Sequence, residues 1–374
     1  MKILVNLIGG QPAPNYIAAK EIKPDKIINL YSESSKIQHN NLCNALNINS
    51  KNEHFIVDAY NYSINENIIN KILAEYSDEN ELILNFTGGT KIMSTAAFKT
   101  FYDKGLKAIY IDTENDKRLE FFERRVTNFK INSAISISDY FKMYGQNFLD
   151  KKITSDNNIL ELNKLIDYLF AHNKELISLI AKVSKMMFNL KGEWNLKNHE
   201  IKDSINTFLW ISESQELILN FKKPVKQSFH LKGIESVKFF CGGWFEEKVN
   251  HTIVQSKFFN ETKMNVKLSV ENLKSAKNKN ELDVVAIKKE VLYIFECKSG
   301  KIKQEDINKL RAIKELFGTY AKIFLVSYFP ISDEVLKEKI KEFKIEFIQF
   351  NKQSNNLRSF IEQFNTKRKQ NINL

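Results

Sequence analysis

Cysteine and histidine are scarce in this sequence. The 374 residues include six histidines and three cysteines, and the cysteines lie far apart as Cys43, Cys241 and Cys297. No CxxC pair occurs, so the spacing that marks zinc sites or a disulfide framework is missing. These absences argue against a disulfide scaffold and against a metal centre built on cysteine or histidine.

Long apolar runs are also missing. No stretch approaches the roughly 20 apolar residues that a membrane-spanning helix needs. The N-terminal MKILVNLIGG is short, and a loop containing two prolines follows it. This pattern predicts a first buried strand and differs from a signal peptide, so we expect a cytoplasmic protein with no membrane partner.

Basic residues outnumber acidic ones. The sequence has 56 Lys and Arg against 45 Asp and Glu, a formal net charge of +11. Such an excess is consistent with binding to nucleic acid or another polyanion. It fits a lysine-rich, solvated surface equally well, so the charge alone assigns no function.

Residues 1–135 alternate short apolar runs with helical patterns. The runs cover residues 2–9, 25–32, 54–60, 81–87 and 107–113, and the clearest helical patterns cover 64–76 and 91–105. Continuous apolar strands separated by helices predict a parallel sheet covered on both faces. We therefore expect an α/β, Rossmann-like domain, with a turn at 113–116 leading into an antiparallel edge hairpin.

The rest of the chain divides into two further parts. Residues 136–235 predict a helical connector, with a long periodic stretch from Ile159 to Phe188. Residues 236–374 predict a second α/β domain in the order α–β–β–β–α–β–α–β. Its two central runs, ELDVVAIK and VLYIFECK, form a hairpin about Lys289 and Glu290 in this interpretation.

Small and polar residues follow three of the N-terminal strands, as GGQPAPN (9–15), SE (32–33) and TGGTK (87–91). Because the carboxyl ends of parallel strands meet at one edge of a sheet, these loops predict a ligand pocket there. Neither GxGxxG nor GxxxxGK[ST] is present, which argues against a nicotinamide cofactor and a P-loop NTPase. The glycines alone fit a tight strand-to-helix turn as well.

A strand followed by T-G-G-T-K-x-M and a helix with Ala96 and Ala97, together with GGQPAPN, resembles the CRISPR-associated Rossmann-fold (CARF) domain family. The resemblance implies a homodimer that binds a cyclic oligoadenylate across its two-fold axis. Cyclic tetra-adenylate suits it, since that ring has two-fold symmetry of its own. The implied ligand-binding residues are Gly10, Gln11, Pro12, Asn15, Ser32, Thr87, Gly88, Gly89, Thr90, Lys91 and Met93.

Acidic and basic side chains gather at the end of the predicted C-terminal hairpin. Residues two apart on a strand face the same side, so Glu296 and Lys298 share a face that Cys297 does not. The hairpin places Asp283 opposite Lys298 or Glu296. Carboxylates that hold Mg²⁺ or Mn²⁺ and a nearby lysine are what phosphodiester cleavage requires, and the carbonyl of Cys297 is a further ligand candidate.

Asp283 followed by Glu296-Cys297-Lys298 resembles the PD-(D/E)xK nuclease superfamily, with Leu282 in place of the name-giving proline. The preceding helix resembles the family's first helix, and we choose Glu246 over Glu247 as its catalytic glutamate. The resemblance thus implies a restriction-endonuclease-like domain. Its catalytic residues would be Glu246, Asp283, Glu296 and Lys298, and its metal would be held by Asp283, Glu296 and Cys297.

The two resemblances together imply a ligand-activated accessory nuclease of type III CRISPR defence. Its substrate would be single-stranded DNA or RNA, or duplex DNA that it nicks. The basic stretch 274–279 and the group Lys303, Lys309, Arg311 and Lys314 would follow a phosphate backbone or form a solvated face. Two alternatives are a ligand-sensing regulator that binds nucleic acid through an inactive nuclease fold, and a nucleotide-dependent enzyme that uses TGGTK as a phosphate loop.

Overall fold

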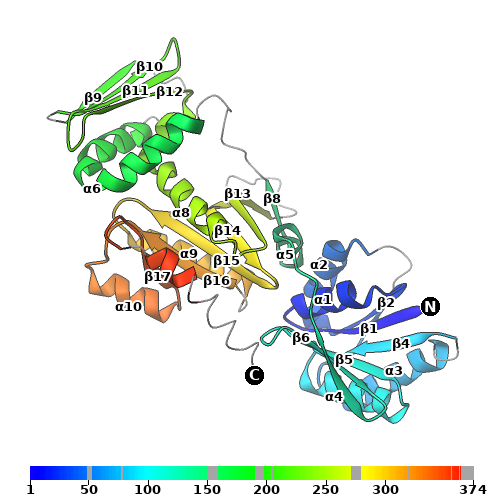
Figure 1. Cartoon of the computed structure of the whole chain (residues 1–374). Helices are drawn as coiled ribbons and strands as arrows, with labels where there is room; N and C mark the ends of the chain where they lie inside the picture. The colour runs from blue at the N-terminus through cyan, green and yellow to red at the C-terminus, as the bar shows by residue number, and fades with distance from the viewer. Residues whose placement is uncertain are drawn as a thin grey trace.

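The computed structural model describes residues 1–48, 53–76, 79–149, 159–189, 198–203, 205–270, 279–318, 321–354, 356–361 and 363 (Figure 1). Three sheets organise these parts of the chain. A seven-stranded sheet lies at one end, a six-stranded sheet lies in the middle and a four-stranded sheet lies at the other end (Figure 1). None of the helices described is long and apolar enough to cross a membrane.

The seven-stranded sheet has the order β3-β2-β1-β4-β5-β6-β7. Its first five strands are parallel and the last two are antiparallel. The strands are β1 (Lys2–Ile8), β2 (Lys26–Tyr31), β3 (Glu53–Ile56), β4 (Glu81–Asn85), β5 (Lys107–Asp112), β6 (Lys117–Phe122) and β7 (Arg125–Lys130). The parallel sheet and the antiparallel edge hairpin are both confirmed.

Helices cover both faces of the parallel strands, as the apolar strands require. Along β1, Leu4 and Ile8 belong to one core cluster, whereas Val5 and Leu7 belong to another. Helices α1 (Ala13–Ile22) and α2 (Lys36–Leu46) pack on the first face, and α3 (Tyr62–Tyr76) and α4 (Lys91–Asp103) pack on the second.

The C-terminal domain follows the predicted order of elements. After a short helix α7 (Glu235–Lys238) and the turn η3 (Phe239–Gly243), its elements are α8 (Trp244–Gln255), β13 (Glu261–Val270), β14 (Lys279–Lys288), β15 (Val291–Lys298), α9 (Gln304–Phe317), β16 (Ala321–Ser327), α10 (Glu334–Glu342) and β17 (Glu346–Gln349). The sheet order is β17-β16-β15-β14-β13-β8. Apolar residues of α9 pack on one face of this sheet, and those of α8 pack on the other.

The segment predicted as a helical connector contains strands as well as helices. It holds α5 (Ile137–Met143), β8 (Gln146–Leu149) and the long helix α6 (Ile159–Asn189), which the periodicity predicted. A four-stranded antiparallel sheet that was not predicted follows, formed by β9 (His199–Lys202), β10 (Thr207–Ile211), β11 (Glu216–Phe221) and β12 (Gln227–Lys232). Strand β8 pairs with β13 and becomes the edge of the C-terminal sheet.

The N-terminal and C-terminal domains contact each other directly. One core cluster joins Tyr16 and Leu42 of the first domain to Phe141 of α5 and to Leu310 and Phe317 of α9. Helix α6 and the four-stranded sheet instead lie on the far side of the C-terminal domain (Figure 1). Of the predicted connector, α5 therefore lies between the two domains, whereas α6 and the four-stranded sheet do not.

Candidate functional site

The first candidate site lies where the strand order of the seven-stranded sheet reverses. Strand β1 has β2 on one side and β4 on the other, so Asn6 pairs in register with both Asn29 and Asn85. In open α/β sheets, ligands bind outside the carboxyl ends of the strands at such a point. The loops GGQPAPN and TGGTK follow β1 and β4, and their backbones meet there. We call this pair of loops the switch-point site.

Backbone packing explains most of the glycines at the switch-point site. A Cβ atom on Gly88 would lie 2.1 Å from the Leu7 carbonyl oxygen, and one on Gly9 would lie 2.7 Å from the Gly89 nitrogen. Gly89 also has a φ of +75°, a conformation that glycine adopts at little cost. These three glycines are therefore required by the fold whether or not a ligand binds. Gly10 differs, since it is exposed with open space beside it.

Buried amides hold the two loops in shape. The Asn85 side-chain amide donates to Asn6 Oδ1 at 3.0 Å and to Asn15 Oδ1 at 2.9 Å, and Asn15 Nδ2 donates to the Leu7 carbonyl at 3.1 Å. The Thr87 hydroxyl donates to Asn85 Oδ1 at 2.7 Å. Asn15 is 0% exposed, so in this arrangement it supports the loops from beneath and does not face a ligand.

The N-terminus of α4 completes the TGGTK side of the site. Thr90 caps the helix, since its Oγ1 accepts a hydrogen bond from the Met93 N–H at 3.2 Å and donates to the Ala59 carbonyl. Met93 is buried behind the turn, whereas Lys91 is the exposed first residue of the helix. A helix N-terminus and an ammonium group both favour a bound anion.

Ser32 and Gln11 occupy two further positions at this edge of the sheet. The Ser32 hydroxyl lies 2.9 Å from that of Ser34, just after β2. Gln11, followed by the buried Pro12 at the start of α1, accepts a hydrogen bond through Oε1 from the Tyr144 hydroxyl at 2.9 Å. Tyr144 ends α5, so a predicted ligand-binding residue contacts the segment that leads into the C-terminal domain.

The second candidate site lies where β14 and β15 run antiparallel. Val284 pairs with Phe295, so Asp283 falls opposite Glu296, as predicted. The Cys297 N–H donates to Asp283 Oδ2 at 2.7 Å, and Lys298 Nζ lies 3.0 Å from Glu296 Oε1. Glu296 is only 2% exposed. We call these residues, with Glu246, the carboxylate–lysine site.

Helix α9 adds two residues that the sequence did not single out for this site. Lys309 Nζ lies 2.7 Å from Glu296 Oε2, and Asp306 Oδ1 lies 3.1 Å from Lys298 Nζ. Burial disfavours the charged form of Lys298, but the neighbouring carboxylates, with Glu296 first and Asp306 next, raise its pKa. Lys298 therefore remains an ammonium group at neutral pH. No spacing in the sequence links α9 to this strand end.

Carboxyl groups are crowded together in the interior of the carboxylate–lysine site. Burial raises the pKa of Asp283 well above its usual value, and the carboxylates of Glu296 and Glu246 raise it further. Burial also raises the pKa of Glu246 to about 7, with contributions from Glu281 and Glu296. Glu247 instead lies 3.7 Å from the His251 ring. The electrostatic influence of Glu296 on Glu246 therefore favours Glu246 over Glu247 as a member of the site.

The donor atoms of this site suit a divalent cation, because carboxylate and carbonyl oxygens are the ligands that Mg²⁺ and Mn²⁺ prefer. Ser327 adds an oxygen, since its Oγ is buried without a hydrogen-bond partner in the described part of the chain and it pairs in register with Lys298. Across the described ranges, however, no three Asp, Glu, His or Cys side chains are grouped closely enough to hold an ion. Lys298 and Lys309 take both oxygens of Glu296, so an ion there would have to displace at least one ammonium group.

Two residues of the predicted basic surface have partners on the protein. Arg311 pairs with Glu315 at 2.9 Å, and Lys314 donates to the carbonyls of Phe343 and Lys344 at 3.0 and 2.6 Å. Apart from Lys279, the basic stretch 274–279 lies outside the described residues.

Two family models match this chain. The Card1 CARF domain matches residues 3–140, and the Card1-like endonuclease domain matches residues 234–368. The two matches correspond to the seven-stranded domain and to the domain with the carboxylate–lysine site. No curated protein matches the chain in sequence.

Solved structures show the same fold over the whole chain. A structure of Can2 from Sulfobacillus thermosulfidooxidans in complex with cyclic tetra-adenylate has a TM-score of 0.72 at 20% identity, covering 98% of this chain and 99% of that one. Protein VC1899 from Vibrio cholerae has a TM-score of 0.77 at 17% identity, with 97% of each chain covered. A type III CRISPR defence DNA nuclease activated by cyclic oligoadenylate has a TM-score of 0.54 at 12% identity, covering 91% of this chain and 51% of that one.

Proposed function

We propose that this chain, which joins a Card1 CARF domain to a Card1-like endonuclease domain, is a PD-(D/E)xK nuclease of type III CRISPR defence that cyclic tetra-adenylate activates to cut nucleic acid in the cytoplasm. The proposed substrate is single-stranded DNA or RNA, with nicking of duplex DNA as a further activity. The similar fold of Can2, whose structure contains cyclic tetra-adenylate, supports this choice of ligand.

The switch-point site would bind the ring as part of a homodimer. A cyclic tetranucleotide has two-fold symmetry, so two copies of one site around a shared axis suit it. Lys91 and the N-terminus of α4 offer positive charge to a phosphate. In the GGQPAPN loop, the space beside Gly10 is open. Gln11 and Ser32 offer polar side chains, while Asn15, Thr87 and Met93 keep the loops in place.

The carboxylate–lysine site would carry out the cleavage. When bound, Mg²⁺ or Mn²⁺ supplies Lewis-acid activation of the phosphate and of water. Asp283, Glu296 and the carbonyl of Cys297 would hold the ion. Lys298, which its carboxylate neighbours keep protonated, would stabilise the charge that develops on the phosphate. Glu246, with a pKa of about 7, can exchange a proton near neutral pH.

The observation that carries the coupling is the position of α9 between the two sites. Its C-terminal Phe317 packs against Phe141 and Tyr144, with ring centroids 4.9 and 6.0 Å apart, and Tyr144 bonds to Gln11. Lys309 of the same helix bonds to Glu296. Lys309, in the middle of α9, lies eight residues before Phe317, about 12 Å at 1.5 Å per residue. A ring that moves the Gln11 loop would shift α9 and with it the ammonium group at Glu296.

Activation of this kind requires that the ring bind the active arrangement more tightly than the inactive one. The proposed route uses only the first part of the segment predicted as a connector, because Tyr144 lies between the domains whereas α6 lies away from their interface (Figure 1). The second candidate function is a regulator that binds nucleic acid without cutting it. The closely packed acidic and basic groups around Glu296 favour the enzyme.

Calorimetric titration tests the sensor half of the proposal. Wild-type protein should bind cyclic tetra-adenylate at one ring per two chains, and Lys91→Ala should weaken that binding. ATP serves as the comparison ligand. Binding of ATP without binding of the ring would overturn the proposal and favour a nucleotide-dependent enzyme.

A further inference from the structure

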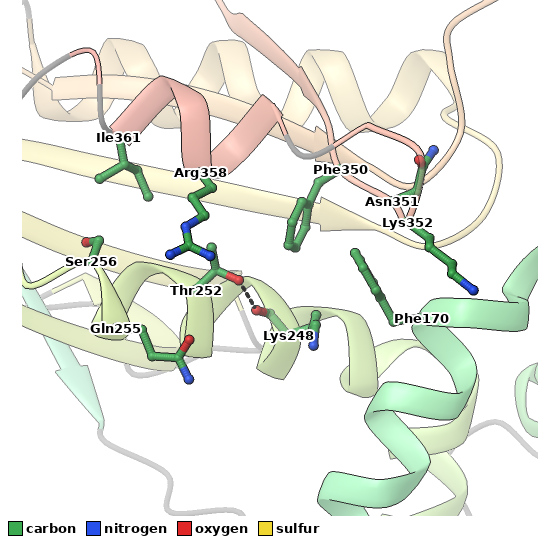
Figure 2. A pocket seen from close by; sticks show the side chains of 10 residues that line it. All are labelled: Phe170, Lys248, Thr252, Gln255, Ser256, Phe350, Asn351, Lys352, Arg358 and Ile361. Carbon is green, nitrogen blue, oxygen red and sulfur yellow. Dashed lines mark hydrogen bonds between the residues drawn. The ribbon is translucent and has the colours of Figure 1, made fainter.

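A groove with a positively charged lining lies beside the nuclease sheet, on the outer side of α8. Its volume is about 460 Å³, and it is lined by α8, by Phe170 of α6 and, after β17, by Phe350, Asn351, Lys352, Arg358 and Ile361. Figure 2 shows Arg358 reaching from the last helix toward α8, with the rings of Phe350 and Phe170 close together in the middle of the groove. None of the residues assigned to the switch-point site or to the carboxylate–lysine site lines this groove. We call it the α8 groove.

The α8 groove begins at the same sheet edge as the carboxylate–lysine site. Strands β15, β16 and β17 are parallel, so their carboxyl ends lie side by side. The Tyr328 N–H donates to the Lys298 carbonyl at 2.9 Å, and Asn351 Nδ2 donates to the Tyr328 carbonyl at 2.8 Å. Asn351 lines the groove. At about 5 Å per strand, the groove starts roughly 10 Å from Lys298.

The chemistry of the lining selects a polyanion. Lys248, Lys352 and Arg358 line the groove, and no Asp or Glu does so among the described residues. Lys248 pairs with Asp167, whose side chain is 75% exposed outside the groove. Lys352 and Arg358 are exposed. Cations in a shared groove follow a phosphate backbone in proteins that bind nucleic acid.

Aromatic rings accompany these cations. The centroids of Phe170 and Phe350 lie 4.9 Å apart, and Lys248 Nζ lies 5.0 Å from the Phe170 centroid. Phe170 is half-buried and can present part of its ring to the groove, while Phe350 is almost wholly buried beneath it. A base can stack on such a ring, and cation–aromatic grooves are typical of single-strand binding.

We propose that the α8 groove binds the nucleic-acid strand next to the scissile phosphate, as a flexible single strand with phosphates at Lys352 and Arg358 and a base at Phe170. This inference rests on the proposed nuclease function. A cavity of this volume lies in the range of small-molecule sites, so it accommodates about one or two nucleotides and not the face of a duplex. The groove thus makes single-stranded nucleic acid the preferred substrate.

The test uses the Lys352→Ala/Arg358→Ala double variant of the full chain. Both side chains are exposed, and the matched control is Lys337→Ala/Lys341→Ala, which removes the same charge from exposed positions of α10. Binding of fluorescent single-stranded DNA and RNA is measured by anisotropy without divalent metal, with cyclic tetra-adenylate, at several salt concentrations. We expect the groove variant to bind at least about tenfold more weakly, with the log–log salt slope reduced by about 1 to 2, and the control to bind like wild type.

A second variant, Phe170→Leu, keeps the residue apolar and removes the ring, and it should weaken single-strand binding without changing the salt slope. If the groove variant binds with wild-type affinity and salt slope, the proposal that the α8 groove binds the strand is wrong. The proposed nuclease function still stands in that case if wild type cuts its substrate with ligand and metal. Equal losses in the groove variant and the α10 control would overturn the groove as well, because they would show only an effect of net charge. Absence of both binding and cutting in wild type would overturn the proposed function and the groove together.

Discussion

The Tyr144 hydroxyl donates a hydrogen bond of 2.9 Å to Gln11 Oε1, which joins the loop after the first strand to the residue that caps the C-terminus of α5. Tyr144 also packs against Phe317 at the end of α9. A predicted ligand-binding residue and the helix that carries Lys309 are therefore separated by one aromatic side chain. This contact provides a physical path between the two candidate sites.

Tyr144→Phe tests this path, because it removes the hydroxyl and keeps the ring that packs on Phe317. One neutral hydrogen bond contributes about 0.5–1.5 kcal/mol, so the ratio of cleavage with ligand to cleavage without it should fall by up to about tenfold. The measurement is that ratio under saturating cyclic tetra-adenylate. Tyr102→Phe, at a side chain that is 46% exposed on α4, is the control. Equal ratios in wild type and both variants would contradict the path.

Glu296→Gln keeps the shape of the side chain and removes the charge that two lysines contact. Cleavage should fall by more than about 100-fold, since even residues behind metal ligands cost 10 to 100-fold when replaced. Calorimetry should give wild-type affinity for the ring, because the switch-point site is untouched. If Glu296→Gln still cuts at the wild-type rate, the carboxylate–lysine site is not the catalytic centre.

Gly88→Ala and Gly10→Ala form a matched pair within the switch-point site. A Cβ on Gly88 would meet a backbone oxygen at 2.1 Å, whereas one on Gly10 would meet nothing within 4 Å. We expect Gly88→Ala to lower the free energy of unfolding by about 1–3 kcal/mol, the usual cost of overpacking. Gly10→Ala should leave it unchanged. Thermal unfolding of both variants measures this difference. Equal loss of stability in Gly88→Ala and Gly10→Ala would contradict the prediction.

His39 makes the stability of the N-terminal domain depend on pH. Burial lowers its pKa to about 4, and the nearby His54 contributes. The other side chains beside it are Tyr31, whose ring stacks at 4.3 Å, and Cys43, whose sulfur lies 3.7 Å from Nδ1. A histidine with a depressed folded pKa prefers to be neutral in the fold, so its stabilising effect is full above about pH 6.5 and is lost as the pH falls toward 4.

Across that window the loss from His39 amounts to as much as about 3 kcal/mol. His39→Phe cannot protonate, so its stability should fall less than that of wild type between pH 6.5 and pH 4. Urea unfolding at a series of pH values gives the difference directly. Parallel pH profiles for the two proteins would show that folding does not lower the pKa of His39 and would contradict this prediction.

The two α/β domains could be predicted because their strands are short apolar runs and because helical patterns separate those runs along the chain. The predicted hairpin placed Asp283 opposite the end of the next strand, and the structure shows that pairing. The two-residue period of a strand predicted that Glu296 and Lys298 share a face that Cys297 does not. The four-stranded sheet was missed although ELILNF (216–221) repeats the residues of a correctly predicted strand (81–86). The shared sequence was itself a usable signal for a strand.

Other features could not be read from the sequence. Lys309 reaches Glu296 because α9 packs back on β15, and no local spacing encodes that distance. The need for glycine at position 88 depends on the Leu7 carbonyl of another strand, which the local sequence does not reveal. Strand β8 likewise pairs with β13, which lies more than 100 positions later in the chain.

The central claim is that a ring bound at the switch-point site turns on the carboxylate–lysine site of the same protein. Its most direct test is cleavage of labelled single-stranded DNA and RNA with Mn²⁺ or Mg²⁺, with and without cyclic tetra-adenylate, in wild type and in Glu296→Ala/Lys298→Ala. The account predicts cutting that requires both the ring and the metal and that the double variant lacks. Tight binding of the ring with no cutting under any of these conditions would contradict it and leave a sensor joined to a nucleic-acid-binding domain.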